Sequence, residues 1–309
     1  MTQPKTITVA DMESILGAPL SPRMCDQVEA ANLKYEEISN EERDHFILDV
    51  LDVLVSQDRL PVAGEHRLPD WERGWSENLS AFTQDHTAEM LVPRYHGKHG
   101  LLHWKQRMIR PLARNFDYLI HCLLVDWAVE TYFSQIDAIY EFGCGPAYHL
   151  LRARRYNPTA RLVGLDWTRA SQKIIAQIVK EGIETNIEGR NFNFYEPDYS
   201  LVIVPNSGVI TIAALEQVGA RFEPFLQFLL DKKPSVCIHL EPISELLDPD
   251  HLIDKLSILY FQKRNYLNGF LTRLQEMEDR GSVKIHRSQR TYTGSFFIEG
   301  HSLIVWSPV

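Results

Sequence analysis

The sequence has few cysteines and no long apolar run. Its 309 residues contain four cysteines, Cys25, Cys122, Cys144 and Cys237, and no pair of them has the Cys-x-x-Cys or another zinc-like spacing. We therefore expect four reduced, mostly buried thiols and no zinc site built on them. No stretch of about eighteen apolar residues is present, so we expect no membrane span. The N-terminus lacks the charged and then apolar pattern of a signal peptide, which predicts a cytoplasmic protein.

The sequence also has no excess of basic over acidic residues. The formal net charge is −9 at pH 7, whereas proteins that bind nucleic acids usually carry positive charge to neutralise phosphates. We therefore expect no nucleic-acid substrate. Internal repeats and low-complexity segments are also absent, which disfavours a scaffold or a solenoid. The length suits one large domain or a domain with a cap.

The most informative stretch covers residues 136–146, Ile-Asp-Ala-Ile-Tyr-Glu-Phe-Gly-Cys-Gly-Pro. An apolar run ends at Glu141, and Gly143-x-Gly145 follows; about twenty residues later a second apolar segment carries Asp166 near its end. A strand, a glycine turn, a helix and a strand that ends in an acid form a nucleotide-binding βαβ unit. The glycines let the backbone approach the ligand, and the acid accepts hydrogen bonds from ribose hydroxyls.

The third glycine of a dinucleotide fingerprint is missing, because Tyr148 stands in its place. Glu141 is also foreign to that fingerprint, and an acid there suits a ligand that carries an ammonium group. Residues 141–147 resemble motif I of the class I S-adenosylmethionine (SAM) methyltransferases, acid-x-Gly-x-Gly-x-Gly, with Ala147 at the last glycine position. An ordinary tight turn in another α/β fold is the alternative.

The C-terminal half continues this resemblance. Residues 207–218 are expected to form a fourth strand and a short helix, with Leu-Glu-Gln where the family commonly has Leu-Glu-His. Residues 234–242 are expected to form a fifth strand bounded by prolines, and residues 283–290 and 295–306 a closing antiparallel pair. The resemblance covers roughly residues 130–309. It implies an α/β fold with a Rossmann-like, mostly parallel seven-stranded sheet and helices on both faces.

The resemblance also implies SAM as the cofactor and a set of cofactor-binding residues. Asp166 would bind the ribose hydroxyls, Trp167 would lie beside the adenine, and Asn193 and Phe194 would line the adenine edge. The full predicted set is Glu141, Gly143, Cys144, Gly145, Asp166, Trp167, Asn193, Phe194 and Ala213.

Candidate catalytic residues come from the fourth and fifth predicted strands. His239 and Glu241 are two residues apart, so alternation puts both on one face near the carboxyl end of the strand, where ligands bind in such sheets. We expect His239 to be the general base, Glu241 to orient it or to bind a substrate hydroxyl, and Glu216 to lie at the same edge. His149, after the glycine turn, is a further candidate. A strand histidine with hydrogen bonds inside the fold is the alternative for His239.

We expect no metal site. His96, His99 and His103 have spacings of three and four, but the glycines between them favour a loop over a helix. The nearest rival is a divalent ion held by His239, Glu241 and Glu216.

Residues 1–128 are predicted to be a helical cap or substrate region, and residues 129–309 the SAM-binding domain. Ser39, with acids after it, is typical of a helix start, and residues 45–55 have apolar positions at helical spacing. Residues 79–91 and 107–132 are also predicted to be helical, and no set of strands is expected.

One run in the cap, residues 90–116, has no acid. We expect its bases to form a positive patch that faces the mouth of the catalytic domain and an anionic acceptor. The alternative is that they pair with acids elsewhere. The bases of the run are Arg94, Lys98, Lys105, Arg107, Arg110 and Arg114.

A second polar and aromatic group lies on residues 260–268, with Arg290 and Tyr292. It suits a hydroxylated, partly anionic small molecule; the alternative is a plain surface helix with an aromatic stripe. The group on residues 260–268 contains Tyr260, Arg264, Asn265, Tyr266 and Asn268.

These patterns together predict a SAM-dependent methyltransferase that methylates an oxygen of a small polar metabolite, such as a sugar or a sugar nucleotide. The alternatives are an aminopropyl-type transferase that uses decarboxylated SAM, and a SAM-fold binding or partner subunit without turnover. The basic run argues against the first, because it would repel a polyamine. The complete set of Gly143, Gly145 and Asp166 argues against the second. We expect a small-molecule acceptor and neither nucleic acid nor membrane as a partner; the sequence leaves both a monomer and a homo-oligomer open.

Overall fold

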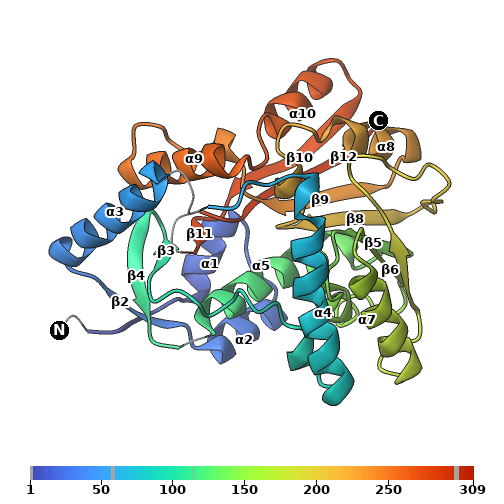
Figure 1. Cartoon of the computed structure of the whole chain (residues 1–309), viewed down its shortest axis with the longest axis horizontal. Coiled ribbons are helices and arrows are strands. Elements are labelled where there is room, and N and C mark those ends of the chain that lie inside the picture. The colour runs from blue at the N-terminus through green and yellow to red at the C-terminus, as the bar shows by residue number, and fades with distance from the viewer. Residues whose placement is uncertain (1–2, 57–59, 114, 296–298) are drawn as a thin grey trace.

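The computed structural model describes residues 3–56, 60–113, 115–295 and 299–309. Its larger sheet has seven strands in the order β10-β12-β9-β8-β5-β6-β7 (Figure 1). β5 to β9 pair in parallel, and β12 runs antiparallel to both of its neighbours. This confirms the predicted Rossmann-like, mostly parallel sheet. Its strands are β5 (Ala138–Phe142), β6 (Arg161–Asp166), β7 (Ile187–Asn191), β8 (Ser207–Ile212), β9 (Val236–Glu241), β10 (Val283–Arg290) and β12 (Ser302–Pro308).

Helices cover both faces of this sheet, as predicted. Strand residues alternate between two apolar clusters, so Ile139 packs with α5, α6 and α7, whereas Tyr140 and Phe142 pack with α8 and α10. Burial on both faces explains the continuous apolar character of the central strands. The helices of this half are α5 (Phe116–Phe133), α6 (Tyr148–Ala153), α7 (Arg169–Lys180), α8 (Glu223–Lys232), α9 (Leu252–Arg264) and α10 (Phe270–Asp279), with the short 3-10 turns η3 (Leu215–Val218) and η4 (Ser244–Leu246).

The N-terminal region contains a second sheet, so the expectation of helices alone was wrong. Its five strands have the order β1-β2-β4-β3-β11, and β11 comes from the far end of the chain. Residues 107–111 form a strand, and the helix predicted to start there begins only at Phe116. The elements are β1 (Lys5–Thr6), α1 (Val9–Leu16), α2 (Pro22–Ala31), β2 (Lys34–Glu37), α3 (Asn40–Val55), η1 (Glu65–Arg67), α4 (Leu68–Gln84), η2 (Ala88–Leu91), β3 (Leu102–Trp104), β4 (Arg107–Pro111) and β11 (Thr293–Gly294).

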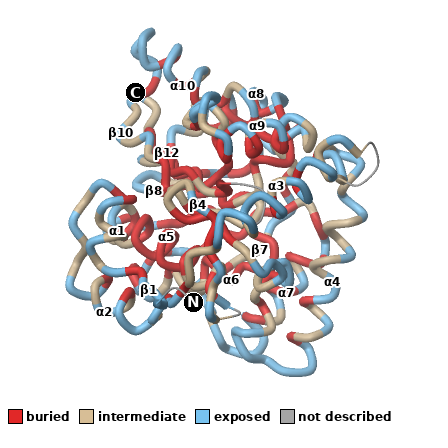
Figure 2. The backbone as a smooth tube through the Cα atoms, turned by 90° about the vertical axis from the view of Figure 1, so that its left-hand side faces the viewer, coloured by how far each residue is buried: buried red, intermediate tan, exposed pale blue. Residues whose placement is uncertain are grey.

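The predicted helix at residues 39–55 is confirmed as α3, whose cap Ser39 accepts a hydrogen bond from the Glu42 backbone N–H. The predicted boundary between residues 128 and 129 falls inside α5, and the division into two domains stays a prediction. Buried residues are concentrated in the sheets and in α5, while the outer sides of α2, α3 and α4 are exposed (Figure 2).

The cysteines and the apolar helices were also subjects of prediction. All four cysteines are free thiols, and Cys122, Cys144 and Cys237 are buried, as predicted. Within the described ranges, none of the helices is long and apolar enough to cross a lipid bilayer.

Candidate functional site

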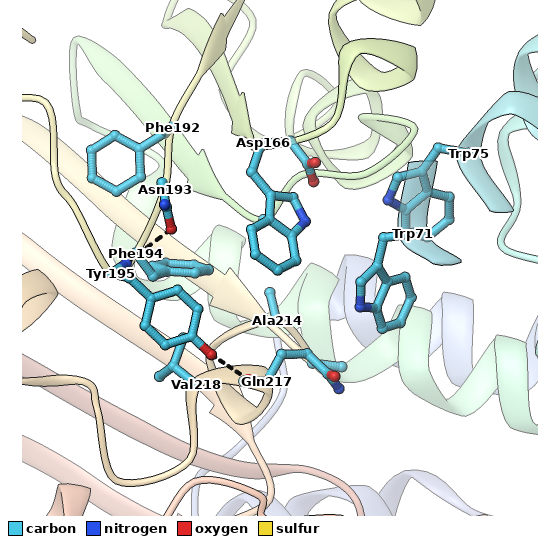
Figure 3. Close-up of a pocket in the computed structure, with 13 residues that line it drawn as sticks. Trp71, Trp75, Asp166, Phe192, Asn193, Phe194, Tyr195, Ala214, Gln217 and Val218 are labelled. Atoms are coloured by element: carbon cyan, nitrogen blue, oxygen red, sulfur yellow. Dashed lines mark hydrogen bonds between the residues drawn. The ribbon is translucent and has the colours of Figure 1, made fainter. Parts of the chain in front are cut away.

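The carboxyl ends of β5, β6 and β8 open into two adjoining cavities. We call them the smaller cavity and the larger cavity; the larger has a volume of about 290 Å³. Both are lined by Gly143, Ala213 and Gln217, and by Trp71 and Trp75 of α4. The other residues of the smaller cavity are Asp166, Trp167, Phe192, Asn193, Phe194, Tyr195, Ala214 and Val218 (Figure 3).

The glycine turn needs both of its glycines. Gly143 and Gly145 have φ angles of +75° and +49°, a region that favours glycine. A Cβ on Gly143 would lie 2.3 Å from the Ala214 Cβ, and one on Gly145 would lie 2.8 Å from the Trp75 ring. The missing side chains therefore let Ala214 and the Trp75 ring pack directly against the turn.

Asp166 lies at the wall of the smaller cavity and already accepts three hydrogen bonds. Its Oδ1 accepts from the Thr168 backbone N–H (2.8 Å) and hydroxyl (2.7 Å), and its Oδ2 accepts from the Gly145 N–H (3.0 Å). Burial raises the pKa of this carboxyl, and these donors act in the opposite direction. Because each carboxylate oxygen accepts about two hydrogen bonds, Oδ2 has room for one further donor.

Aromatic side chains face each other across the smaller cavity. Figure 3 shows Phe194 and Tyr195 on one side and Trp71 and Trp75 on the other. Phe194, Asn193 and Trp167 were predicted from the sequence and line the cavity, whereas the two tryptophans of α4 were not predicted. Their spacing of four residues on one helix face was the available signal.

The α4 helix is fixed over the cavities by a hydrogen-bonded contact. Glu72 accepts hydrogen bonds from the backbone N–H groups of Arg169 (2.7 Å) and Ala170 (3.1 Å), at the start of α7. A carboxylate is favoured at a helix N-terminus, where it meets unpaired N–H groups and the positive end of the helix dipole. This contact holds Trp71 and Trp75 against the glycine turn.

Four histidines surround one side of the larger cavity. The His121 ring lies 5.4 Å from His96, 5.2 Å from His149 and 4.7 Å from His301, measured between ring centres. Burial lowers the pKa of His121 and His149 well below the usual value, and it lowers the pKa of His301 to about 4. His121, His149 and His301 are therefore neutral imidazoles at pH 7. Of these four, only His149 was predicted from the sequence as a candidate catalytic residue.

Glu141 has a protein partner where an ammonium group was predicted. The residue is 1% exposed and lines neither cavity. Its Oε1 lies 2.9 Å from the His149 Nδ1. Burial, and then the nearby Asp166, raise the pKa of Glu141 well above the usual value.

His239 has its hydrogen-bond partners inside the fold, and its role as general base stays a prediction. The ring is fully buried and lines neither cavity. Its Nε2 accepts a hydrogen bond from the Trp306 indole N–H (2.9 Å), so the ring proton is on Nδ1, which donates to the Thr211 hydroxyl (2.9 Å). Burial lowers the pKa of His239 to about 3. This geometry is that of the alternative, a strand histidine with hydrogen bonds inside the fold.

Glu241 accepts hydrogen bonds from three backbone N–H groups, and its catalytic role stays a prediction. Its Oε1 accepts from the backbone N–H groups of Ala214 (3.1 Å) and Leu215 (3.0 Å), and its Oε2 accepts from that of Glu216 (3.1 Å). The carboxylate thus satisfies the unpaired donors at the start of η3. Burial raises its pKa to about 7, against the effect of these donors. Glu241 acts by fixing the segment that carries Ala213 to Val218.

Glu216 is the predicted catalytic residue that reaches a cavity. It lines the larger cavity, and its Oε1 accepts a hydrogen bond from Gln217 (2.7 Å). Burial, and then Glu241, raise its pKa to about 8, so the carboxyl is mostly protonated at pH 7. Its role as a catalytic residue stays a prediction.

Two arginines bring positive charge to the larger cavity. Arg264 donates through Nη1 to the Tyr260 hydroxyl (2.9 Å) and lies over the Tyr266 ring, and its Nε is buried without a partner. Arg67 donates through Nε to Asp70 (2.7 Å), and its Nη1 is also buried without a partner. The polar group predicted at residues 260–268 therefore supplies Arg264 and Tyr266 to the cavity.

The acid-free run does not form the predicted patch. The bases that lie on β4 and in the β3–β4 turn form ion pairs with acids of β2, α1 and α3. Arg94, earlier in the run, pairs with Glu77 (3.6 Å). Arg114 lies outside the described residues. The run instead contributes Tyr95, His96 and His99 to the larger cavity. The other ion pairs are Lys105–Asp11, Arg107–Glu37 and Arg110–Glu42.

No protein-family model matches the chain, and no curated protein matches its sequence. Solved structures similar to it include magnesium protoporphyrin IX methyltransferase (ChlM) from Synechocystis PCC 6803 with bound SAM, which is 12% identical; the match covers 62% of this chain and 82% of that chain, with a TM-score of 0.43. The N-methyltransferase NodS from Bradyrhizobium japonicum WM9 in complex with S-adenosyl-L-homocysteine is 8% identical, over 75% of this chain and 98% of that chain, with a TM-score of 0.46. TnmH is 14% identical; the match covers 87% of this chain and 70% of that chain, with a TM-score of 0.45. All these identities and TM-scores are low, so the function proposed below depends on the geometry of the site.

Removal of divalent metal ions is expected to leave activity unchanged. Among the described residues, no group of three His, Cys, Asp or Glu side chains is arranged to hold a metal ion. His239 and Glu241, two members of the rival site, have their polar atoms engaged by other groups. Turnover measured before and after treatment with a chelator checks this expectation. A loss of turnover that magnesium or manganese restores would contradict it.

Proposed function

We propose that the chain is a SAM-dependent methyltransferase that methylates a hydroxyl of a small polar acceptor carrying an anionic group. The observation that carries the proposal is the junction of the two cavities at the glycine turn. The smaller cavity has the groups that an adenosine needs, and the larger cavity has polar groups suited to an acceptor. The shared wall at Gly143 and Ala213 would bring the two ligands together.

The residues of the smaller cavity fit the adenosine part of SAM. Asp166 has a remaining lone pair on Oδ2 for a ribose hydroxyl, and Gly143 of the turn lines the same cavity without a side chain. The aromatic walls around Phe194 and Tyr195 suit a flat adenine. When bound, SAM supplies an electrophilic methyl group on sulfur, and this chain contributes binding, orientation and exclusion of water.

The larger cavity suits a small polar acceptor. Its volume of about 290 Å³ lies near the lower end of ligand pockets. An unpaired buried donor or acceptor costs about 1–3 kcal/mol, which a polar ligand would recover. Several polar atoms of its lining residues are buried without a hydrogen-bond partner: Arg67 Nη1, Trp71 Nε1, His96 Nε2, His121 Nδ1, Tyr148 Oη, Gln217 Oε1, Arg264 Nε and His301 Nδ1.

Charge in the larger cavity supports an anionic acceptor and disfavours a polyamine. Arg264 and Arg67 are cations, and Arg67 is already paired with Asp70. Glu216 is mostly neutral at pH 7 because its pKa is raised to about 8. Among the described lining residues, Asp117 is the carboxylate that stays ionised, because hydrogen bonds from His96 and the Gly97 N–H outweigh the effect of burial and lower its pKa. Arg264 is therefore the cation left for an acceptor. A guanidinium forms strong, often paired hydrogen bonds with carboxylates and phosphates. An acidic sugar or a sugar nucleotide has the required hydroxyls and negative charge. The aminopropyl-type alternative needs a cationic acceptor, which these arginines would repel.

Replacing Arg264 by glutamine is expected to raise the KM for the acceptor about tenfold or more. The loss of a charge-assisted hydrogen bond costs about 1.5–3 kcal/mol, and about 1.4 kcal/mol corresponds to a factor of ten. The affinity for SAM should not change, because Arg264 lines only the larger of the two cavities. Steady-state kinetics and calorimetry check both parts. Arg280→Gln, at an exposed position after α10, is the matched control. An unchanged KM would remove the argument for an anionic acceptor.

The experiment that tests the proposed function is methyl transfer from labelled SAM. The purified protein is incubated with methyl-labelled SAM and a metabolite extract, and mass spectrometry identifies the labelled products. We expect a labelled, hydroxylated anion. A partner subunit without turnover would give no labelled product, and an aminopropyl-type transferase would use decarboxylated SAM instead.

A further inference from the structure

We propose that His121, His149 and Glu141 form a proton relay, in which His121 takes the proton from the acceptor hydroxyl and Glu141 finally holds it. This inference rests on the proposed methyltransferase function and names its general base. It also gives Glu141, a residue of the glycine-turn motif, a role in proton transfer in place of ammonium binding.

The three side chains make a continuous chain of contacts from the larger cavity to the sheet. His121 of α5 lines the cavity, and its Nε2 lies 3.1 Å from the Nε2 of His149 on α6. The His149 Nδ1 lies 2.9 Å from the Oε1 of Glu141 on β5. All three are nearly inaccessible to solvent, with exposures of 3%, 7% and 1%. The outer end of the chain, His121 Nδ1, is buried without a hydrogen-bond partner.

These contacts fix where the protons lie, because each neutral imidazole carries one proton. When Glu141 is ionised, the His149 Nδ1–H donates to it, and the His149 Nε2 accepts from the His121 Nε2–H. His121 then keeps a lone pair on Nδ1, and this is the receptive state. When Glu141 is protonated, every proton has moved by one position, and His121 Nδ1 carries a hydrogen. The relay thus takes up one proton without forming an imidazolium in either state.

Methyl transfer supplies that proton. The acceptor oxygen forms a bond to the methyl carbon, the carbon–sulfur bond of SAM breaks, and its electron pair stays on sulfur. The hydroxyl proton moves to His121 Nδ1, the His121 Nε2 proton moves to His149 Nε2, and the His149 Nδ1 proton moves to Glu141 Oε1. One sulfonium charge and one carboxylate charge disappear together, so the net charge of the site is unchanged.

The surroundings favour storage of the proton on Glu141 over either histidine. Burial lowers the pKa of His121 and His149 and raises that of Glu141. A single added proton is therefore most stable at the carboxyl end of the relay. The groups that face the histidines are His96, His301 and Arg152, and those that face Glu141 are Asp166, Cys144, Tyr95, Tyr148 and the Leu150 backbone N–H.

The pH dependence of turnover follows from these states. The receptive state needs an ionised Glu141, and the pKa of that carboxyl is raised. As the pH falls through the raised pKa, the relay fills with a proton at rest, and His121 Nδ1 can no longer act as a base. The kcat should therefore rise with pH through the apparent pKa of the relay and stay level above it.

Nitrogen NMR on protein with ¹⁵N-labelled histidine rings tests the relay without an acceptor. The spectra are recorded with S-adenosyl-L-homocysteine across the pH range, and His121→Gln and His149→Gln assign the signals. We expect both rings to change tautomer together at one apparent pKa and to stay uncharged. Glu141→Gln should abolish this transition, and Glu216→Gln, which removes a buried carboxyl outside the relay, should keep it. Independent titration of the two rings, or an imidazolium on either, would overturn the relay.

Kinetics of Glu141→Gln with the acceptor found by labelling provide the second test. We expect kcat to fall on the order of 100-fold, as for the loss of general acid–base catalysis. The rise of kcat with pH that the native enzyme shows should disappear, and the affinity for SAM should not change. Weaker SAM binding with an unchanged kcat would show that Glu141 binds the cofactor and would overturn the relay. If labelled SAM gave no methylated product at all, the proposed function would fail, and the NMR result would still decide whether the three residues share a proton.

Discussion

A folded Asp166→Ala variant is expected to bind SAM at least about tenfold more weakly than the native protein. Asp166 Oδ2 accepts one hydrogen bond from Gly145 and has room for a ribose hydroxyl. Loss of a hydrogen bond to a charged group costs about 1.5–3 kcal/mol, and about 1.4 kcal/mol is a factor of ten in the dissociation constant. The turn around Gly145 also loses its acceptor, which adds to the effect. Calorimetric titration measures the change.

Two controls make this result specific to the cofactor site. Circular dichroism and thermal unfolding establish that the variant is folded. Glu188→Ala removes an acid from the neighbouring strand β7, where Glu188 pairs with Arg161 and Arg190 and lies outside both cavities. It should bind SAM like the native protein. Unchanged SAM affinity in a folded Asp166→Ala variant would remove the ribose contact from the proposal.

Replacing Glu241 by alanine is expected to destabilise the protein by about 3 kcal/mol or more. The variant leaves the buried backbone N–H groups of Leu215 and Glu216 and the part-buried N–H of Ala214 without their acceptor, and each buried, unpaired donor costs about 1–3 kcal/mol. Glu241→Gln keeps one acceptor oxygen and should lose less. Urea unfolding measures the free energy of unfolding of both variants.

The expected result for Glu241 separates a structural role from the catalytic role predicted from the sequence. A catalytic carboxylate could be removed with loss of turnover and little change in stability. Glu276→Ala removes an exposed carboxylate of α10 that pairs with Arg273, and it should change stability by less than about 1 kcal/mol. Native stability of Glu241→Ala, combined with loss of turnover, would contradict the structural assignment.

The large sheet and the glycine turn could be predicted because their signals are local. Each central strand is a short apolar segment that is buried on both faces, and the turn after β5 contains its own glycines. The small sheet could not be predicted in this way. β3 pairs with β11, almost two hundred residues later in the chain, and the β3–β4 turn uses Lys105 and Gln106 at positive φ in place of the usual Asn-Gly.

The cofactor side of the site was easier to predict than the acceptor side for a similar reason. Most of the predicted cofactor residues lie at strand ends, and most of them line one of the two cavities. The four histidines come from separate segments of the chain, and only the fold brings His96 and His301 to His121. The sequence pattern predicted the strand that carries His239, but it could not show that the Trp306 indole of β12 would donate a hydrogen bond to this ring.

Calorimetric titration of the native protein with SAM is the most direct test of the central claim that this chain binds SAM at the glycine turn. We expect saturable binding of one SAM per chain, comparable binding of S-adenosyl-L-homocysteine, and no binding of a nicotinamide dinucleotide, because Tyr148 occupies the position of the third glycine. Absence of SAM binding by the folded protein, or binding of the dinucleotide in its place, would contradict the account.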